Sequence, residues 1–163
     1  MTTTLTDPDL TTRLLRVDHS IPFAQALSHA VGPAGECHPE FTAERFPLTG
    51  SGVIEYETRY LYLNRKYSPH DIESFVLRKI DTAYPWLFAE TGHLLGFAKE
   101  YSDEYRKHRI LAMGSTTIIR GFARMPCVAK FGNGPQIDLS WLDDTLDNGE
   151  QPYRILLVRP RRY

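Results

Sequence analysis

The pentapeptide Glu36-Cys37-His38-Pro39-Glu40 gathers a thiol, an imidazole and two carboxylates in one short stretch. A metal site needs three or four ligands brought together in space, usually including a closely spaced pair of cysteines or histidines, and the pentapeptide has no such pair beside it. A nucleophilic Cys37 would need a neighbouring base and a lowered pKa, and no cysteine-enzyme signature surrounds it. We therefore expect a polar loop that holds neither a metal nor a cofactor.

Carboxylates form two further candidate groups. The acidic run near the C-terminus does not fit a calcium loop beginning at Asp144, because Leu146 and Ile155 occupy the third and twelfth positions, where oxygen ligands are required. Glu55 and Glu57 share one face of an expected strand; with Arg59 following, an exposed salt-linked face is the simpler interpretation. A small hydrolase-like enzyme stays open as an alternative, with a site assembled from scattered acids and histidines: Glu55, Glu57, His70 and Asp138.

Charge is distributed unevenly along the chain. Residues 1–105 hold 9 Lys and Arg against 15 Asp and Glu, whereas residues 106–163 hold 10 against 5, so a formal net charge of −1 conceals two parts of opposite sign. Such asymmetry points to an acidic partner, a nucleic acid or another copy of the same protein. The near-neutral total argues against a dedicated nucleic-acid-binding domain, which is typically far more basic.

The basic residues concentrate in two stretches, residues 116–131 and 153–163, which contain no carboxylate. Cations interleaved with aromatic side chains suit phosphate contact and base stacking, but they also suit an edge strand protected from aggregation, or a tail that docks on an acidic protein. We expect the C-terminal tail to be the main partner-binding segment, through Arg159, Arg161, Arg162 and Tyr163. The earlier basic strand is the second candidate, through Arg120 and Arg124.

Hydrophobic periodicity predicts both helices and strands. Helices are expected over residues 21–31, capped by Ser20, over residues 68–85, and over residues 93–107. Strands are expected over residues 53–63, 109–113, 116–131 (interrupted at Gly121 and Pro126), 135–141 and 153–159. Gly132-Asn133-Gly134 is a hairpin signal, and the apolar run at residues 155–158 is typical of a central strand.

These elements predict a single α+β domain over residues 13–163, with two to three helices packed on a mainly antiparallel sheet that ends in a C-terminal β-meander. Residues 1–12 are Thr-rich and are expected to form a flexible N-terminal arm. Two cysteines do not make a disulfide scaffold, and no stretch approaches the ~18 apolar residues of a membrane span.

The function expected from this pattern is a non-enzymatic, macromolecule-binding or assembly subunit of the accessory or virus-encoded kind, structural or inhibitory. Its partner would be another protein or copies of itself, with a nucleic-acid-binding module as an alternative. We expect it in the cytoplasm, or inside a virus particle if it assembles there.

Overall fold

A computed structural model describes residues 11–62, 70, 85–141 and 153–162. Within these residues the chain forms one mixed sheet of nine strands and three helices, which confirms the α+β class. Strand residues outnumber helical residues about two to one, so the sheet is the dominant element. The expected helix over residues 68–85 and most of the N-terminal arm fall outside the described residues.

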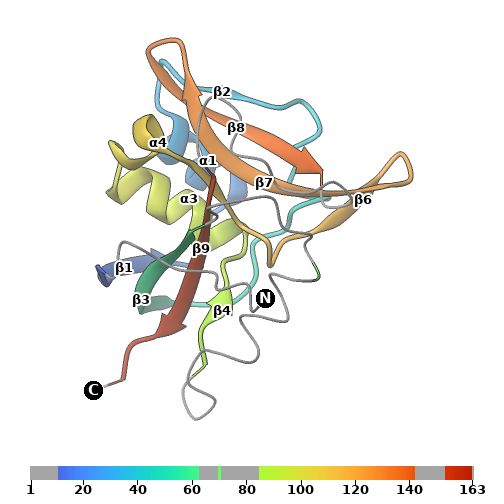
Figure 1. Cartoon of the computed structure of the whole chain (residues 1–163). Coiled ribbons are helices and arrows are strands. Elements are labelled where there is room, and N and C mark those ends of the chain that lie inside the picture. The colour runs from blue at the N-terminus through green and yellow to red at the C-terminus, as the bar shows by residue number, and fades with distance from the viewer. Residues whose placement is uncertain (1–10, 63–69, 71–84, 142–152, 163) are drawn as a thin grey trace, which may run out of the picture.

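The sheet is ordered β1-β3-β9-β5-β7-β8-β2, with β4 pairing β9 and β6 pairing β7 as additions to this path (Figure 1). Six of the pairings in the described residues are antiparallel, whereas β9 runs parallel to β5 and β2 runs parallel to β8. The strands are β1 (Arg13–Asp18), β2 (Glu36–Cys37), β3 (Val53–Tyr62), β4 (Leu87–Phe88), β5 (Arg109–Leu111), β6 (Thr117–Ile119), β7 (Phe122–Phe131), β8 (Gly134–Trp141) and β9 (Tyr153–Pro160).

Strand β9, the last in the sequence, lies in the middle of the sheet. Its residues Ile155, Leu156, Leu157 and Val158 are all at most 3% exposed. Leu156 and Val158 belong to the core cluster that faces the helices, while Ile155 and Leu157 belong to a second cluster on the opposite face. Burial on both faces explains the continuous apolar run seen in the sequence.

The C-terminal β-meander is not continuous. Strands β7 and β8 form the expected hairpin, turning at Gly132 with φ 57° and pairing Phe131 with Gly134. Strand β9 does not pair with β8 but lies between β3 and β5. The interruption expected at Pro126 is also absent, because β7 continues through this residue. The Pro126 carbonyl accepts a 3.0 Å hydrogen bond from the Ala112 N–H.

The helices lie together on one face of the sheet, where α3 packs against α1, β1 and β7 (Figure 1). Helix α1 (Phe23–Val31) begins later than expected, because Pro22 occupies the N-cap position and Ser20 bonds to Asp18 instead. The expected helix over residues 93–107 is divided into α3 (Thr91–Glu100) and α4 (Glu104–Lys107).

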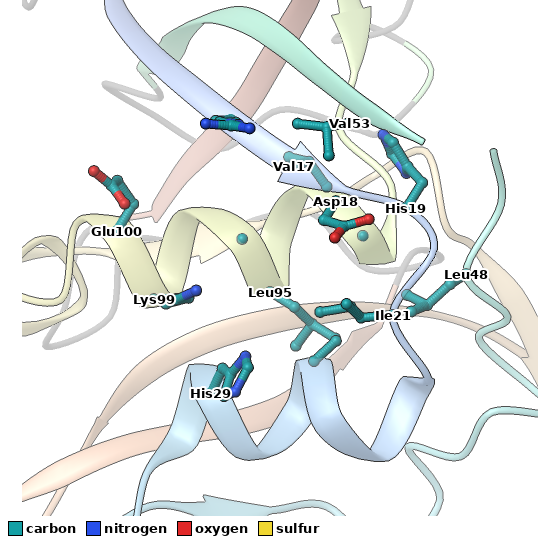
Figure 2. A pocket seen from close by; sticks show the side chains of 14 residues that line it. Val17, Asp18, His19, Ile21, His29, Leu48, Val53, Leu95, Lys99 and Glu100 are labelled. Carbon is teal, nitrogen blue, oxygen red and sulfur yellow. The ribbon is translucent and has the colours of Figure 1, made fainter. Parts of the chain in front are cut away.

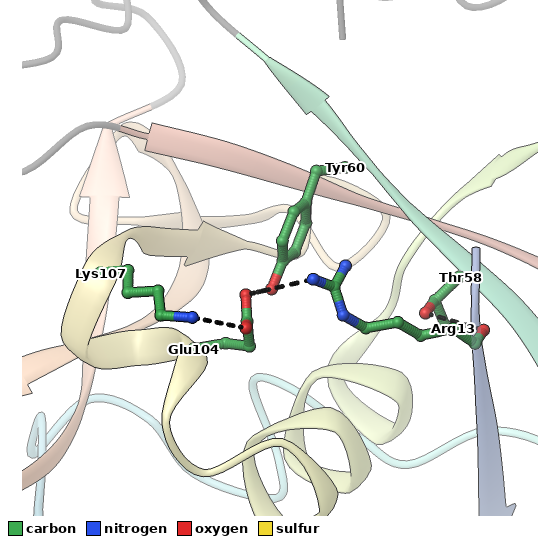
Figure 3. A network of polar contacts seen from close by, with 5 residues as sticks. All are labelled: Arg13, Thr58, Tyr60, Glu104 and Lys107. Atoms are coloured by element: carbon green, nitrogen blue, oxygen red, sulfur yellow. Dashed lines mark hydrogen bonds and ion pairs between the residues drawn. The ribbon is translucent and has the colours of Figure 1, made fainter. Parts of the chain in front are cut away.

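A polar network joins α4 to the N-terminal strands (Figure 3). The half-buried Glu104 carboxylate accepts a 2.8 Å hydrogen bond from the Tyr60 hydroxyl and lies 3.7 Å from the Arg13 guanidinium. Arg13 also stacks over the Tyr60 ring at 5.1 Å, and Lys107 approaches Glu104 at 3.5 Å. A carboxylate of the acidic part of the chain is thus shared by cations from β1 and α4.

A second polar cluster lies in the core at the start of α3. His19 Nε2 and the Tyr56 hydroxyl are 2.7 Å apart, and the His93 ring packs edge-to-face on both side chains. His93 Nδ1 accepts a hydrogen bond from the Glu90 N–H, forming a capping box at the helix start. Burial lowers the pKa of His93 to about 4, with a smaller contribution from the nearby His19. His93 is therefore neutral at pH 7.

This depressed pKa predicts a specific acid sensitivity. Between pH 6.5 and 4 the unfolded chain binds a proton at His93 that the folded chain does not bind, so the free energy of unfolding falls as the pH falls, by about 3 kcal/mol across this window. We expect His93→Gln, which keeps an acceptor at the third helical position, to show a pH dependence smaller by that amount in urea unfolding at pH 7 and pH 4. Equal pH dependence in the two proteins would contradict this account.

Candidate interaction surface

The hairpin β6–β7 projects from the right side of the molecule in Figure 1, within the basic stretch singled out from the sequence. Ile119 pairs with Phe122, so the turn between them has only two residues, Arg120 and Gly121. Both have positive φ, at 52° and 83°, which is the turn geometry that matches the twist of a two-stranded hairpin. Arg120 therefore stands at the tip, with its side chain 85% exposed.

One face of this hairpin forms the wall of a groove of about 400 Å³, which we call the hairpin groove. Cross-strand pairs place Ile119, Phe122 and Arg124 on the same hairpin face, and Leu139 of β8 contributes to the floor. The opposite wall comes from the segment after β2, with His38, Pro39 and Glu40. The groove thus brings together the pentapeptide and the basic strand, two features far apart in the sequence.

Polar contacts hold the groove walls in place. The Arg120 guanidinium lies 3.3 Å from the Glu40 carboxylate, spanning the two walls, and Glu40 also lies 3.5 Å from Arg45. Arg124 donates a 2.9 Å hydrogen bond to the Leu139 carbonyl, which fixes this side chain along the neighbouring strand. A groove with an apolar floor and an internally paired cation at its edge can accept an apolar side chain.

The hairpin exposes apolar side chains on both of its faces. Ile118 is 64% exposed and Phe122 is 48% exposed, and their register places them on opposite faces. At the other end of β7, Phe131 is 51% exposed but is not part of the groove. The β6–β7 hairpin therefore combines exposed aliphatic, aromatic and arginine side chains over a few residues.

The tail arginines lie elsewhere and are engaged by the chain itself. Arg159 pairs with Glu57 at 2.6 Å, directly across from it on β3, and Arg161 pairs with Glu55 at 3.2 Å. We call these two pairs the β3–β9 ion-pair ladder. Arg159 also stacks over the buried Trp86 ring at 4.3 Å. Arg162 is exposed, and Tyr163 lies outside the described residues.

The structure brings Arg120 and Arg124 together in the hairpin groove but does not join them to the tail. Strand β5 lies between β7 and β9, so the two basic stretches are in one sheet without being neighbours. That the tail arginines bind a partner remains a prediction. An acidic partner would have to compete with Glu55 and Glu57 for Arg159 and Arg161.

The geometry of the other candidates favours structural roles. The Cys37 thiol is half-buried, burial raises its pKa, and it donates to the backbone carbonyl of His38 at 3.4 Å. His38 Nδ1 accepts a 3.1 Å hydrogen bond from the Glu40 N–H, so this imidazole shapes the loop. No group of three or more His, Cys, Asp or Glu in the described part of the chain is arranged to hold a metal ion. Of the acidic run Asp138, Asp143, Asp144, Asp147 and Glu150, only Asp138 lies within the described residues.

Comparisons with family models, with curated proteins and with solved structures gave no match for this chain. No helix among the residues with described positions is long and apolar enough to cross a lipid bilayer.

Sequence reasoning missed the pairing of the pentapeptide with the basic strand, because only the tertiary fold places Glu40 beside Arg120. It also did not identify Ile118 as an exposed side chain. The one available signal was the dipeptide Arg120-Gly121 between two β-prone runs, which is compatible with a two-residue hairpin. That signal locates a turn but says nothing about what lies across from it.

The ion-pair ladder gives a matched comparison of two tail arginines. The Arg159–Glu57 side chains are 19% and 27% exposed, whereas those of Arg161 and Glu55 are 39% and 38% exposed. We expect Arg159→Met to lower the free energy of unfolding by about 1–3 kcal/mol, since it removes a short charge-assisted bond and the stacking on Trp86. Arg161→Met should cost below about 1 kcal/mol. Urea unfolding measures both, and equal costs would contradict the described ladder.

Proposed function

We propose that this protein is a non-enzymatic binding or assembly subunit that engages another protein through the hairpin groove and the β6–β7 hairpin. The observation that carries the proposal is the exposure of Phe122 and Ile118 on a projecting hairpin beside Arg120 and Arg124. Aromatic and arginine side chains are the types enriched at the energetic centres of protein interfaces. The two-residue turn joins β6 directly to β7, so these side chains lie close together on the hairpin.

A protein partner fits this surface better than a nucleic acid. Glu40 lies inside the groove next to Arg120, where its carboxylate would repel a phosphate. The highly exposed Ile118 adds an aliphatic contact that base stacking does not use. The partner that complements the groove presents an apolar side chain, which would lie against Phe122 and Leu139 while Arg120 keeps its pairing with Glu40.

Photo-crosslinking tests this surface against a matched control on the same strand. Benzoylphenylalanine is placed at Phe122 in one variant and at Phe131 in another, because the two phenylalanines are almost equally exposed at opposite ends of β7. In cells that naturally make the protein, we expect position 122 to give one discrete crosslinked protein, position 131 to give none, and Arg120→Glu to abolish the product at 122.

Each other outcome has a defined meaning. Identical products from both positions, or no product from either, would overturn the proposed surface. A crosslink from position 122 to a second copy of the chain would assign the groove to self-association instead of a foreign protein. A crosslink to nucleic acid would replace the proposal with the nucleic-acid-binding alternative.

A further inference from the structure

A second cavity, of about 250 Å³, lies between β1, α1 and α3 (Figure 2). Figure 2 shows His29 of α1 and Lys99 of α3 reaching toward each other across the space between the two helices, with Asp18 on the β1 side and Leu95 at the base. This cavity lies outside the hairpin groove and shares no lining residue with it. We call it the helix pocket.

The helix pocket has an apolar base, and on the α3 side it is lined partly by Gly92 and Gly96, which have no side chains. Val17 and Leu95, both at most 5% exposed, form part of this base. A Cβ at Gly96 would lie 3.2 Å from Val17 Cγ2, so a larger residue there would have to displace Val17 by a few tenths of an ångström. Gly92 is different: a Cβ would meet His19 and Leu48 only at ordinary contact distances of 3.6–3.8 Å. Packing therefore does not require the glycine at position 92, and the space it leaves belongs to the pocket.

Charged side chains of both signs line the pocket around this apolar base. Arg16, Lys99 and Glu100 all line the pocket, and none of them makes an ion pair or side-chain hydrogen bond within the described part of the chain. Asp18 also lines it, and hydrogen bonds from Ser20 lower the pKa of Asp18, which keeps it a carboxylate. Most other cations of the described chain have a carboxylate partner, for example Arg13, Arg45, Arg159 and Arg161.

From this arrangement we propose that the helix pocket binds a small zwitterion with an apolar side chain, the chemistry of a free aliphatic or aromatic amino acid. The apolar side chain would lie on Val17 and Leu95, the carboxylate would face Arg16 and Lys99, and the ammonium group would face Asp18. A simple anion fits less well, because Asp18 and Glu100 would repel it. The volume is slightly below the ~300–1,000 Å³ typical of pockets for larger ligands, which excludes a dinucleotide-sized molecule.

Binding is tested with probes that differ by one charged group. L-Leucine carries both charges, 4-methylpentanoate lacks the ammonium group, and 3-methylbutylamine lacks the carboxylate. We expect L-leucine or L-phenylalanine to bind saturably in calorimetry and to shift the NMR signals of His29 and His19. The two single-charge analogues should bind at least about tenfold more weakly than L-leucine, because each leaves one set of pocket charges unmatched.

Three variants of the full chain separate a specific site from adventitious binding. Lys99→Ala should weaken L-leucine binding by roughly tenfold, while Lys107→Ala, which removes an exposed lysine of α4 outside the pocket, should leave it unchanged. Gly92→Ala should weaken binding by filling the His19 end of the pocket, yet keep or raise the melting temperature, since alanine favours a helix.

The proposal is overturned by any of three results. These are absence of saturable binding by both amino acids, equal affinity for leucine and its single-charge analogues, and equal effects of Lys99→Ala and Lys107→Ala. Because the helix pocket and the hairpin groove share no residue, none of these results bears on the proposed protein interface.

Discussion

The structure depends on the insertion of the last strand into the middle of the sheet. Strand β9 joins β1 and β3 on one side to β5, β7, β8 and β2 on the other, so without it the described sheet would separate into two parts. Its side chains supply both core clusters, Leu156 and Val158 to one and Ile155 and Leu157 to the other. Strand β9 therefore contributes to the buried cluster on each face of the sheet.

The same insertion brings part of the basic C-terminal charge against acidic residues of the same chain. Because β9 pairs with β3, the basic C-terminal segment meets the acidic face of a strand from the acidic part of the chain, and Glu57 and Glu55 take Arg159 and Arg161 as partners. Lys107 of the basic part makes a similar link to Glu104 of the acidic part. Part of the opposite charge that suggested an external partner is therefore matched internally. The arginines beside exposed apolar groups lie instead at the hairpin groove, which makes the hairpin the stronger candidate for recognition.

Sequence patterns predicted individual strands and turns, because these depend mainly on residues that are close together in the sequence. The pattern of residues 53–63 predicted strand β3, the glycine-rich turn predicted the β7–β8 hairpin, and the apolar run predicted β9 as a central strand. The place of β9 between β3 and β5 could not be predicted, because strand order depends on packing between distant segments. The hydrophobic periodicity of one segment does not specify which strands become its neighbours. The groove was missed for the same reason: Arg120 was a candidate from its charge, but its position opposite Glu40 arises only when β2 adds to the far edge of the sheet.

Native-state hydrogen exchange tests the central position of β9 most directly. If β9 holds the sheet together, the amides of Ile155–Val158 should exchange only through global unfolding, with the same free energy that urea denaturation gives, while the turn at Arg120 and Gly121 exchanges rapidly. Faster exchange of β9 than of β3 and β7 would show that the strand detaches while the rest stays folded. That result would contradict its role as the joint between the two parts of the sheet.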